Sequence, residues 1–136
     1  MLDFNSLNVF AVLVAALVST MLGGLWYSPV LFGPAWLAEI GKSADDLGPA
    51  GAAIAGSAFS CLVAATAVDL LCAATGTAGL IPGATLGLVL GLGIVAMTML
   101  SDALFSGWSP KLYLIQLGYR ATYLVIMGAI CGVWRA

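Results

Sequence analysis

Four long apolar runs limit what this chain can fold into more than any other feature of its sequence. Each run has about 20 residues, the length that an α-helix needs to cross a bilayer. Open strands cannot cross lipid, because their backbone groups would lack hydrogen-bond partners, and the runs lack the alternation of barrel strands. We therefore predict an all-α fold, an integral membrane four-helix bundle that forms a single transmembrane domain over residues 1–136. The predicted spans are Leu7–Tyr27, Ala50–Ala74, Pro82–Phe105 and Leu112–Trp134.

The scarcity of charged side chains agrees with a chain whose main solvent is lipid. Only 7% of the residues are charged, whereas soluble domains have roughly 25%. The four cations are scattered, so we expect no nucleic-acid partner. The chain has no histidine, and its three cysteines lie inside apolar runs without the spacing of zinc or redox sites. We expect buried free thiols, no metal and no cofactor.

The loop between the first two spans is the only sizeable segment outside the predicted membrane region. Ser28-Pro29 should end the first span, because proline disfavours helix at the preceding residue. Pro34 is suited to the first turn of a new helix, and Gly41 to its end. We predict a short helix that lies in the membrane interface. The alternative is an irregular loop that is anchored by one aromatic residue, Trp36.

The four predicted spans place both termini on one side of the membrane, here called side A. The Trp36 loop and the Ser106–Lys111 turn then lie on the opposite side, side B. Lys42 and Lys111 are on side B and Arg135 is on side A, so the positive-inside rule favours a cytoplasmic side B. We expect a multi-pass protein of the bacterial inner membrane. The first run is interpreted as a span and not as a signal peptide, because no basic segment precedes it and no cleavage site follows it.

Small residues recur at four-residue spacing in every span, a pattern that lets membrane helices pack closely. The most regular stripe is in the third span, at Gly83, Gly87 and Gly91, and predicts a packed helix interface there. A bundle of four helices has a limited interior. We therefore expect another stripe to face a second subunit, which gives a homo-oligomer.

Arg120 is the most unusual residue, because no other charge lies within eight residues of it. At 1.5 Å per residue it lies roughly 13 Å below the side-B end of its span. A central arginine costs about 2.5–3.5 kcal/mol on insertion scales, so it should face the bundle interior. Gln116, four residues before it, and Tyr123, three residues after it, share its face.

We predict that Asp102 of the third span pairs with Arg120, because a tight turn makes the third and fourth spans antiparallel neighbours. Arginine is long enough to reach toward side B, and a carboxylate can accept both arms of its guanidinium. Two interpretations of this pair stay open. It could fix the register of the helices, or it could belong to a gate or binding point on a polar pathway.

Asp69 is the third charged residue within the spans, near the side-A end of the second. Its helical position puts it about 15 Å or more from Arg120, too far for a direct pair. Asn8 is a better-placed neighbour. Asp69 is then either a protonated carboxyl or, if the second helix ends early, a group in contact with interfacial water.

Two segments of the chain resemble a known family. They are "GGLWYSPVLFGPAWL" (Gly23–Leu37) and "DALFSGWSPKLYLIQLGYRATYLVIMGAICGVW" (Asp102–Trp134), and they are similar to the signature regions of the family called domain of unknown function 1761. The turn "SGWSP" departs from the more charged turn of that family. The resemblance implies a four-span bacterial membrane protein without a known activity. It also implies a shared pattern at Trp26, Tyr27, Pro29, Phe32, Gly33, Trp36 and Arg120.

Three classes of function are compatible with these features. The first is a non-enzymatic homo-oligomeric bundle that is stabilised by the Asp102–Arg120 pair. The second is a small transporter or channel whose polar path includes Asp102, Gln116, Arg120 and Tyr123, with Asp69 relaying protons. An intramembrane enzyme is disfavoured, because no nucleophile stands beside a base, and we expect no catalytic residues. Besides the lipid bilayer, a small ion or a lipid head group is an open candidate ligand.

Overall fold

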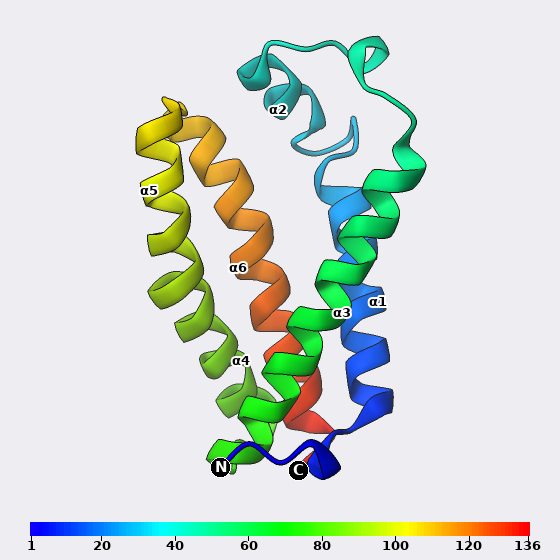
Figure 1. Ribbon diagram of the computed structural model, residues 1–136, viewed down its shortest axis with the longest axis vertical. Coiled ribbons are helices and arrows are strands. Elements are labelled where there is room, and N and C mark those ends of the chain that lie inside the picture. The colour runs from blue at the N-terminus through cyan, green and yellow to red at the C-terminus, as the bar shows by residue number, and fades with distance from the viewer.

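The computed structural model describes all 136 residues and confirms the all-α, four-span architecture. Figure 1 shows both termini together at side A, and α2 at the opposite end, side B. The third span is one continuous rod, Leu80–Ser106, made of three consecutive helical segments. Every predicted span agrees with the observed bounds to within two residues. The elements are η1 (Phe4–Ser6), α1 (Val9–Trp26), α2 (Gly33–Ile40), η2 (Ala44–Asp46), α3 (Ala50–Thr75), α4 (Leu80–Val89), the π-helical η3 (Leu90–Val95), α5 (Ala96–Ser106) and α6 (Pro110–Val133).

Local capping signals fix the ends of the spanning helices. The Asn8 side chain accepts a hydrogen bond from a backbone N–H in the first turn of α1, which is the usual role of asparagine at a helix start. Ser109 does the same for α6, and Pro110 is the first residue of that helix. Gly76, with a φ of 67°, ends α3 in the left-handed conformation that glycine adopts most easily.

The loop after α1 contains the predicted short helix, α2, so the irregular-loop alternative is wrong. Pro34 lies in its first turn and Gly41 ends it with a φ of 69°. Farther along, the backbone N–H and the hydroxyl of Ser43 both donate to the Asp46 carboxylate at 2.9 Å. These hydrogen bonds, the backbone one first, lower the pKa of the exposed Asp46 carboxyl.

The glycine stripe of the third span forms the closest helix contact in the protein, which confirms the packed interface. Gly83 lies against the backbone of Gly128, and Gly87 lies against the backbone of Leu124. A Cβ atom at either glycine would overlap a carbonyl oxygen of α6. The stripe therefore joins α4 to α6 within the chain.

The buried core occupies the half of the bundle nearest side A. It joins α1, α3 and α6, and α3 has no buried residue before Cys61. The side-B half of α3 is therefore more exposed than its side-A half. The core cluster consists of Ala11, Val12, Ala15, Ala16, Cys61, Ala65, Val68, Cys72, Leu124, Met127 and Cys131.

The π-helical segment η3 rotates the second half of the third span relative to the first half. In α4 and η3 the buried positions are four residues apart, at Gly83, Gly87 and Gly91. The next buried position is Ala96, five residues on, and it is followed by Met99 and Ala103. A π turn contains one more residue than an α turn. The face of α5 that packs against α6 is therefore shifted by one residue.

Candidate ligand-binding site

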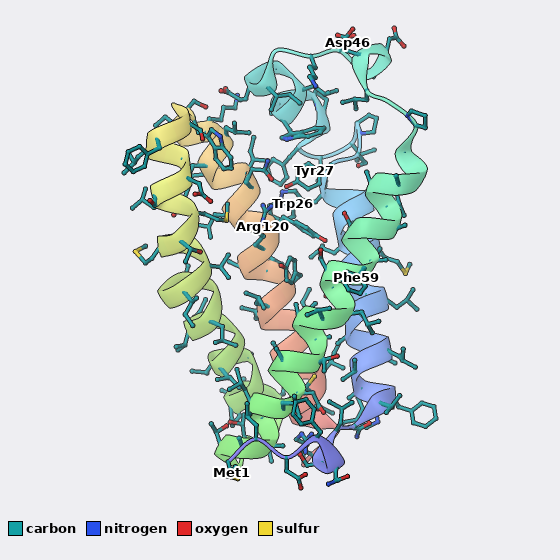
Figure 2. All side chains as sticks on the ribbon, viewed as in Figure 1. Met1, Trp26, Tyr27, Asp46, Phe59 and Arg120 are labelled. Carbon is teal, nitrogen blue, oxygen red and sulfur yellow. The ribbon has the colours of Figure 1, made fainter.

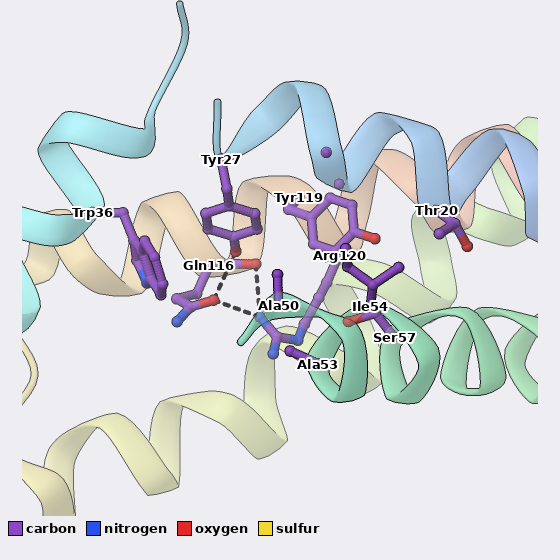
Figure 3. Close-up of a pocket in the computed structure, with 12 residues that line it drawn as sticks. Thr20, Tyr27, Trp36, Ala50, Ala53, Ile54, Ser57, Gln116, Tyr119 and Arg120 are labelled. Carbon is purple, nitrogen blue, oxygen red and sulfur yellow. Dashed lines mark hydrogen bonds between the residues drawn. The ribbon is translucent and has the colours of Figure 1, made fainter. Parts of the chain in front are cut away.

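Arg120 faces the bundle interior, as predicted, and it reaches toward side B. Its Nη1 donates to the backbone carbonyl of Gln116 at 3.1 Å and to Gln116 Oε1 at 3.0 Å. Figure 3 shows both bonds and places the guanidinium beside Ala53 and Ser57 of α3. In Figure 2, Arg120 lies in the side-B half of the bundle, close to Trp26 and Tyr27.

The structure does not form the predicted Asp102–Arg120 pair. Asp102 is exposed on α5 and makes no ion pair. The single salt bridge of the protein joins Asp69 and Arg135. An uninterrupted α-helix would turn position 102 toward α6, but the extra residue of η3 turns Ala103 there instead. On α6, Ala121 contacts the third span at Gly91. Successive residues of an α-helix are about 100° apart, so the neighbouring Arg120 points away from that span.

Arg120 instead lines a cavity of about 490 Å³ near side B, here called the Arg120 pocket. Helices α1, α3 and α6 form its walls, and α2 contributes Trp36 at its side-B end. The volume is in the range of pockets that hold small molecules, about 300–1,000 Å³. The lining residues are Thr20, Gly23, Gly24, Tyr27, Trp36, Ala50, Ala53, Ile54, Ser57, Gln116, Tyr119 and Arg120.

A second hollow of about 540 Å³ continues from this pocket, and we call it the α3–α6 groove. Its lining comes from α3 and α6 alone, so no third helix covers it. Arg120 belongs to both hollows and joins them. The lining residues of the groove are Ala53, Gly56, Ser57, Ser60, Cys61, Tyr119, Arg120 and Tyr123.

The segment between α1 and α2 forms the roof of the pocket. Trp26 Nε1 donates to the carbonyl of Ile115 at 3.1 Å, and the Trp26 ring stacks on Phe32 with centroids 4.7 Å apart. Gly33 lies so close to the carbonyls of residues 27 and 28 that a side chain there would collide with them. These contacts hold the start of α2 against α6.

Tyr27 and Trp36 connect this roof to the arginine. The Tyr27 hydroxyl donates to Gln116 Oε1 at 2.8 Å, so this one oxygen accepts from both Tyr27 and Arg120. Trp36 contacts the edge of Tyr27, with ring centroids 5.2 Å apart. Ser109 of the α5–α6 turn donates to the Glu39 carboxylate and fixes the far end of α2.

Tyr119 and Tyr123 complete the site on α6. The Tyr119 hydroxyl donates to the carbonyl of Ser19 at 3.0 Å and lies directly over Gly23, where a Cβ would be 2.7 Å from it. The Tyr123 ring lies edge-on to Tyr119 at 5.0 Å, and its hydroxyl makes no hydrogen bond. Tyr123 was expected near Arg120, whereas Tyr119 was missed, because it lies one position away from the face that contains Gln116 and Arg120.

Asp69 lies at side A, outside the pocket and the groove, and it has a cation of its own. Its carboxylate is fully buried and pairs with Arg135, at 2.8 Å from Nη2 and 3.3 Å from Nε. The Asn8 N–H also donates to it at 2.8 Å, which confirms the predicted neighbour. Arg135 donates in addition to the carbonyl of Ser6 at 2.9 Å. The alternative of an early end to the second helix, with Asp69 in contact with interfacial water, is wrong, because α3 continues to Thr75 and Asp69 is fully buried.

Of the predicted site residues, the structure thus brings together Gln116, Arg120 and Tyr123 and separates Asp69 and Asp102 from them. No three Cys, Asp or Glu side chains are close enough together to hold a metal ion. A guanidinium has five N–H donors, and only the two on Nη1 are used here. The Nε–Nη2 edge, with three N–H groups, is free to bind an oxyanion in the two-pronged geometry that arginine favours.

Comparison with known proteins gives a family and no characterised relative. Neither a curated protein nor a solved structure matches the chain. A family model, described as "Protein of unknown function (DUF1761)", matches residues 10–132. This match contains the whole of the first segment on which the resemblance was based and all but the last two residues of the second, and it includes the roof of the pocket and the arginine. The chain, a membrane protein of four spanning helices, therefore belongs to the DUF1761 family.

Proposed function

We propose that this protein is a non-enzymatic membrane protein that binds an anionic ligand at Arg120, in the two hollows that this residue joins. The observation that carries the proposal is the guanidinium itself, which has no carboxylate partner and three unused N–H groups beside a cavity. A permanent cation at this depth is expensive unless an anion or water compensates it. The bound anion supplies that compensation.

The transporter alternative has less support than binding. Gln116, Arg120 and Tyr123 line the hollows, but Asp102 does not, and Asp69 is already engaged by Arg135. Below the groove, fully buried side chains such as Met127 and Cys131 fill the side-A half of the bundle. A pocket that is closed at one end favours binding over conduction.

Enzymatic activity is also disfavoured. The Tyr119 hydroxyl and the Cys61 thiol approach each other at 3.8 Å, but no carboxylate or histidine lies beside them to act as a base. Nucleophilic catalysis requires such an activating group. The site has donors for an anion and no group that would attack one.

An Arg120→Gln variant tests the proposal directly. Decyl phosphate or decanoate, added to the protein in neutral detergent, should raise its melting temperature, whereas decanol should not. At a ligand concentration 100 times Kd the stabilisation is about 2.7 kcal/mol. The glutamine variant should lose this response, and Arg120→Lys should retain part of it. An equal response of the wild type and the glutamine variant would exclude the site, provided that both show the same helical circular dichroism.

Homo-oligomer assembly stays part of the proposal. Most of the small-residue stripes are covered within the chain, but Gly51 and Ala55 of α3, which line neither the pocket nor the groove, are exposed. Exposed small residues on a membrane helix support close packing with a second copy. Native mass spectra of the same detergent samples report the number of copies, and a strictly monomeric protein would count against assembly.

For the orientation, we propose the bacterial inner membrane, with the loops after the first and third spans in the cytoplasm. The Arg135–Asp69 pair neutralises the side-A cation, which leaves Lys42 and Lys111 as the unpaired cations of side B. A cysteine that replaces Asp45 in the exposed loop should be labelled only after a membrane-impermeant thiol reagent gains access to the cytoplasm. The native thiols are all buried and give little background. If the reagent labels this cysteine in intact cells, the loop lies outside the cytoplasm and the proposed orientation is wrong.

A further inference from the structure

We propose that the ligand is the phosphate-type head group of a membrane lipid, bound in the α3–α6 groove by Arg120, Ser57, Ser60 and Tyr123. The inference rests on the proposed anion-binding function and names the class of anion and its source. It starts from the polar groups of the groove that the fold leaves unused.

Every unused polar group in the groove can donate a hydrogen bond. The hydroxyls of Ser57, Ser60 and Tyr123 have no partner, and the Nε–Nη2 edge of Arg120 is free. No acidic side chain lines the groove, so nothing there repels an anion.

The number of these donors favours phosphate over carboxylate. A carboxylate has two oxygens, which the two prongs of a guanidinium satisfy. A phosphate group offers a third oxygen and more, which can accept from the surrounding hydroxyls. With Arg120 on α6 and Ser57 and Ser60 one turn apart on α3, the donors lie on both walls of the groove.

The position of the groove favours a lipid over a free anion. Only two helices line it, and Gly56 and Ser60 of α3 are exposed, so the hollow opens sideways toward the bilayer. Because the guanidinium bonds back to Gln116, it lies roughly 9 Å along α6 from the side-B end of that helix. Basic pockets between membrane helices near such an interface bind lipid head groups.

The experiment measures dissociation constants by native mass spectrometry in neutral detergent, with phosphatidic acid, oleate and inorganic phosphate as probes. Wild-type protein should bind phosphatidic acid at least about tenfold more tightly than oleate, since each hydrogen bond to a charged group contributes about a factor of ten. The double variant Ser57→Ala/Ser60→Ala should lose this preference and keep its affinity for oleate. Ser101→Ala, an exposed serine on α5, is the matched control and should change nothing.

The possible failures separate this inference from the proposed function. If oleate binds as tightly as phosphatidic acid, or the double serine variant binds both like the wild type, the head-group assignment is overturned and anion binding stands. If inorganic phosphate displaces phosphatidic acid at equal concentration, the lipid source is overturned. If Arg120→Gln binds both lipids like the wild type, the inference and the proposed function fall together.

Discussion

Replacing Arg135 with alanine should lower the free energy of unfolding by about 3–5 kcal/mol, the usual cost of removing one partner of a buried ion pair. The substitution leaves the fully buried Asp69 carboxylate with the Asn8 N–H as its hydrogen-bond donor. It also removes the contact between the last residues of the chain and Ser6. Arg135 itself is only 19% exposed, so water screens the pair weakly. Thermal and denaturant unfolding in neutral detergent measure the loss.

Two further variants show whether the effect belongs to the pair. Lys111→Ala removes an exposed cation that has no ion pair, and it should unfold like the wild type. The double variant Asp69→Leu/Arg135→Met should recover most of the lost stability, since apolar residues can replace a buried pair. If Arg135→Ala unfolds like Lys111→Ala, the pair contributes nothing to the stability of side A.

Replacing Gly87 with valine should destabilise the protein by about 3 kcal/mol, the upper end of the usual cost of overpacking. The new Cβ would overlap the carbonyl oxygen of Leu124, and the atoms it meets are backbone atoms of α6. Backbone in the middle of a helix cannot move aside as a flexible side chain can, so α4 and α6 must separate. The yield of folded protein on gel filtration and its melting temperature measure the effect.

Gly93→Val is the matched control for this substitution. It lies in the same span, and a Cβ added there has no atom within 4 Å. Both variants exchange a glycine for a β-branched residue in a helical segment, so the difference between them isolates the contact with α6. Equal stabilities would mean that the close approach of α4 to α6 is not required for the fold.

The architecture was predictable because it depends on hydrophobicity and on local signals. Runs long enough to cross a bilayer gave the four spans, and Pro34 and Gly41 gave the bounds of α2. The inward direction of Arg120 followed from the cost of exposing a cation to lipid. Each of these inferences needs only a short stretch of sequence.

The partner of Arg120 was not predictable, because it depends on the exact register of two helices. The extension of the α-helical period from Gly91 points Asp102 toward α6, but the π segment adds one residue to that period. Nothing in the sequence around residues 90–95 distinguishes a π turn from an α turn. A shift of one residue was enough to turn a predicted ion pair into an exposed carboxylate and an unpaired guanidinium.

The partner of Asp69 was missed for another reason. Arg135 follows the last span, and it was therefore treated only as a charge that reports the orientation of the chain. In the structure, Arg135 follows directly on the end of α6, and its side chain contacts both Asp69 of α3 and Ser6. Likewise, the Arg120 pocket is lined by residues of four helices. No local sequence pattern predicts that these residues lie close together.

The placement of the core at side A and of the pocket at side B has a consequence for how the protein can vary. The groups that hold the bundle together, the Arg135–Asp69 pair and the buried cluster around Met127, share no residue with the donors that we assign to the ligand. Local regions of a protein can differ widely in their stability. Substitutions at Ser57 or Ser60 can therefore change which ligand is recognised with little loss of stability, whereas Tyr123 also packs against the core.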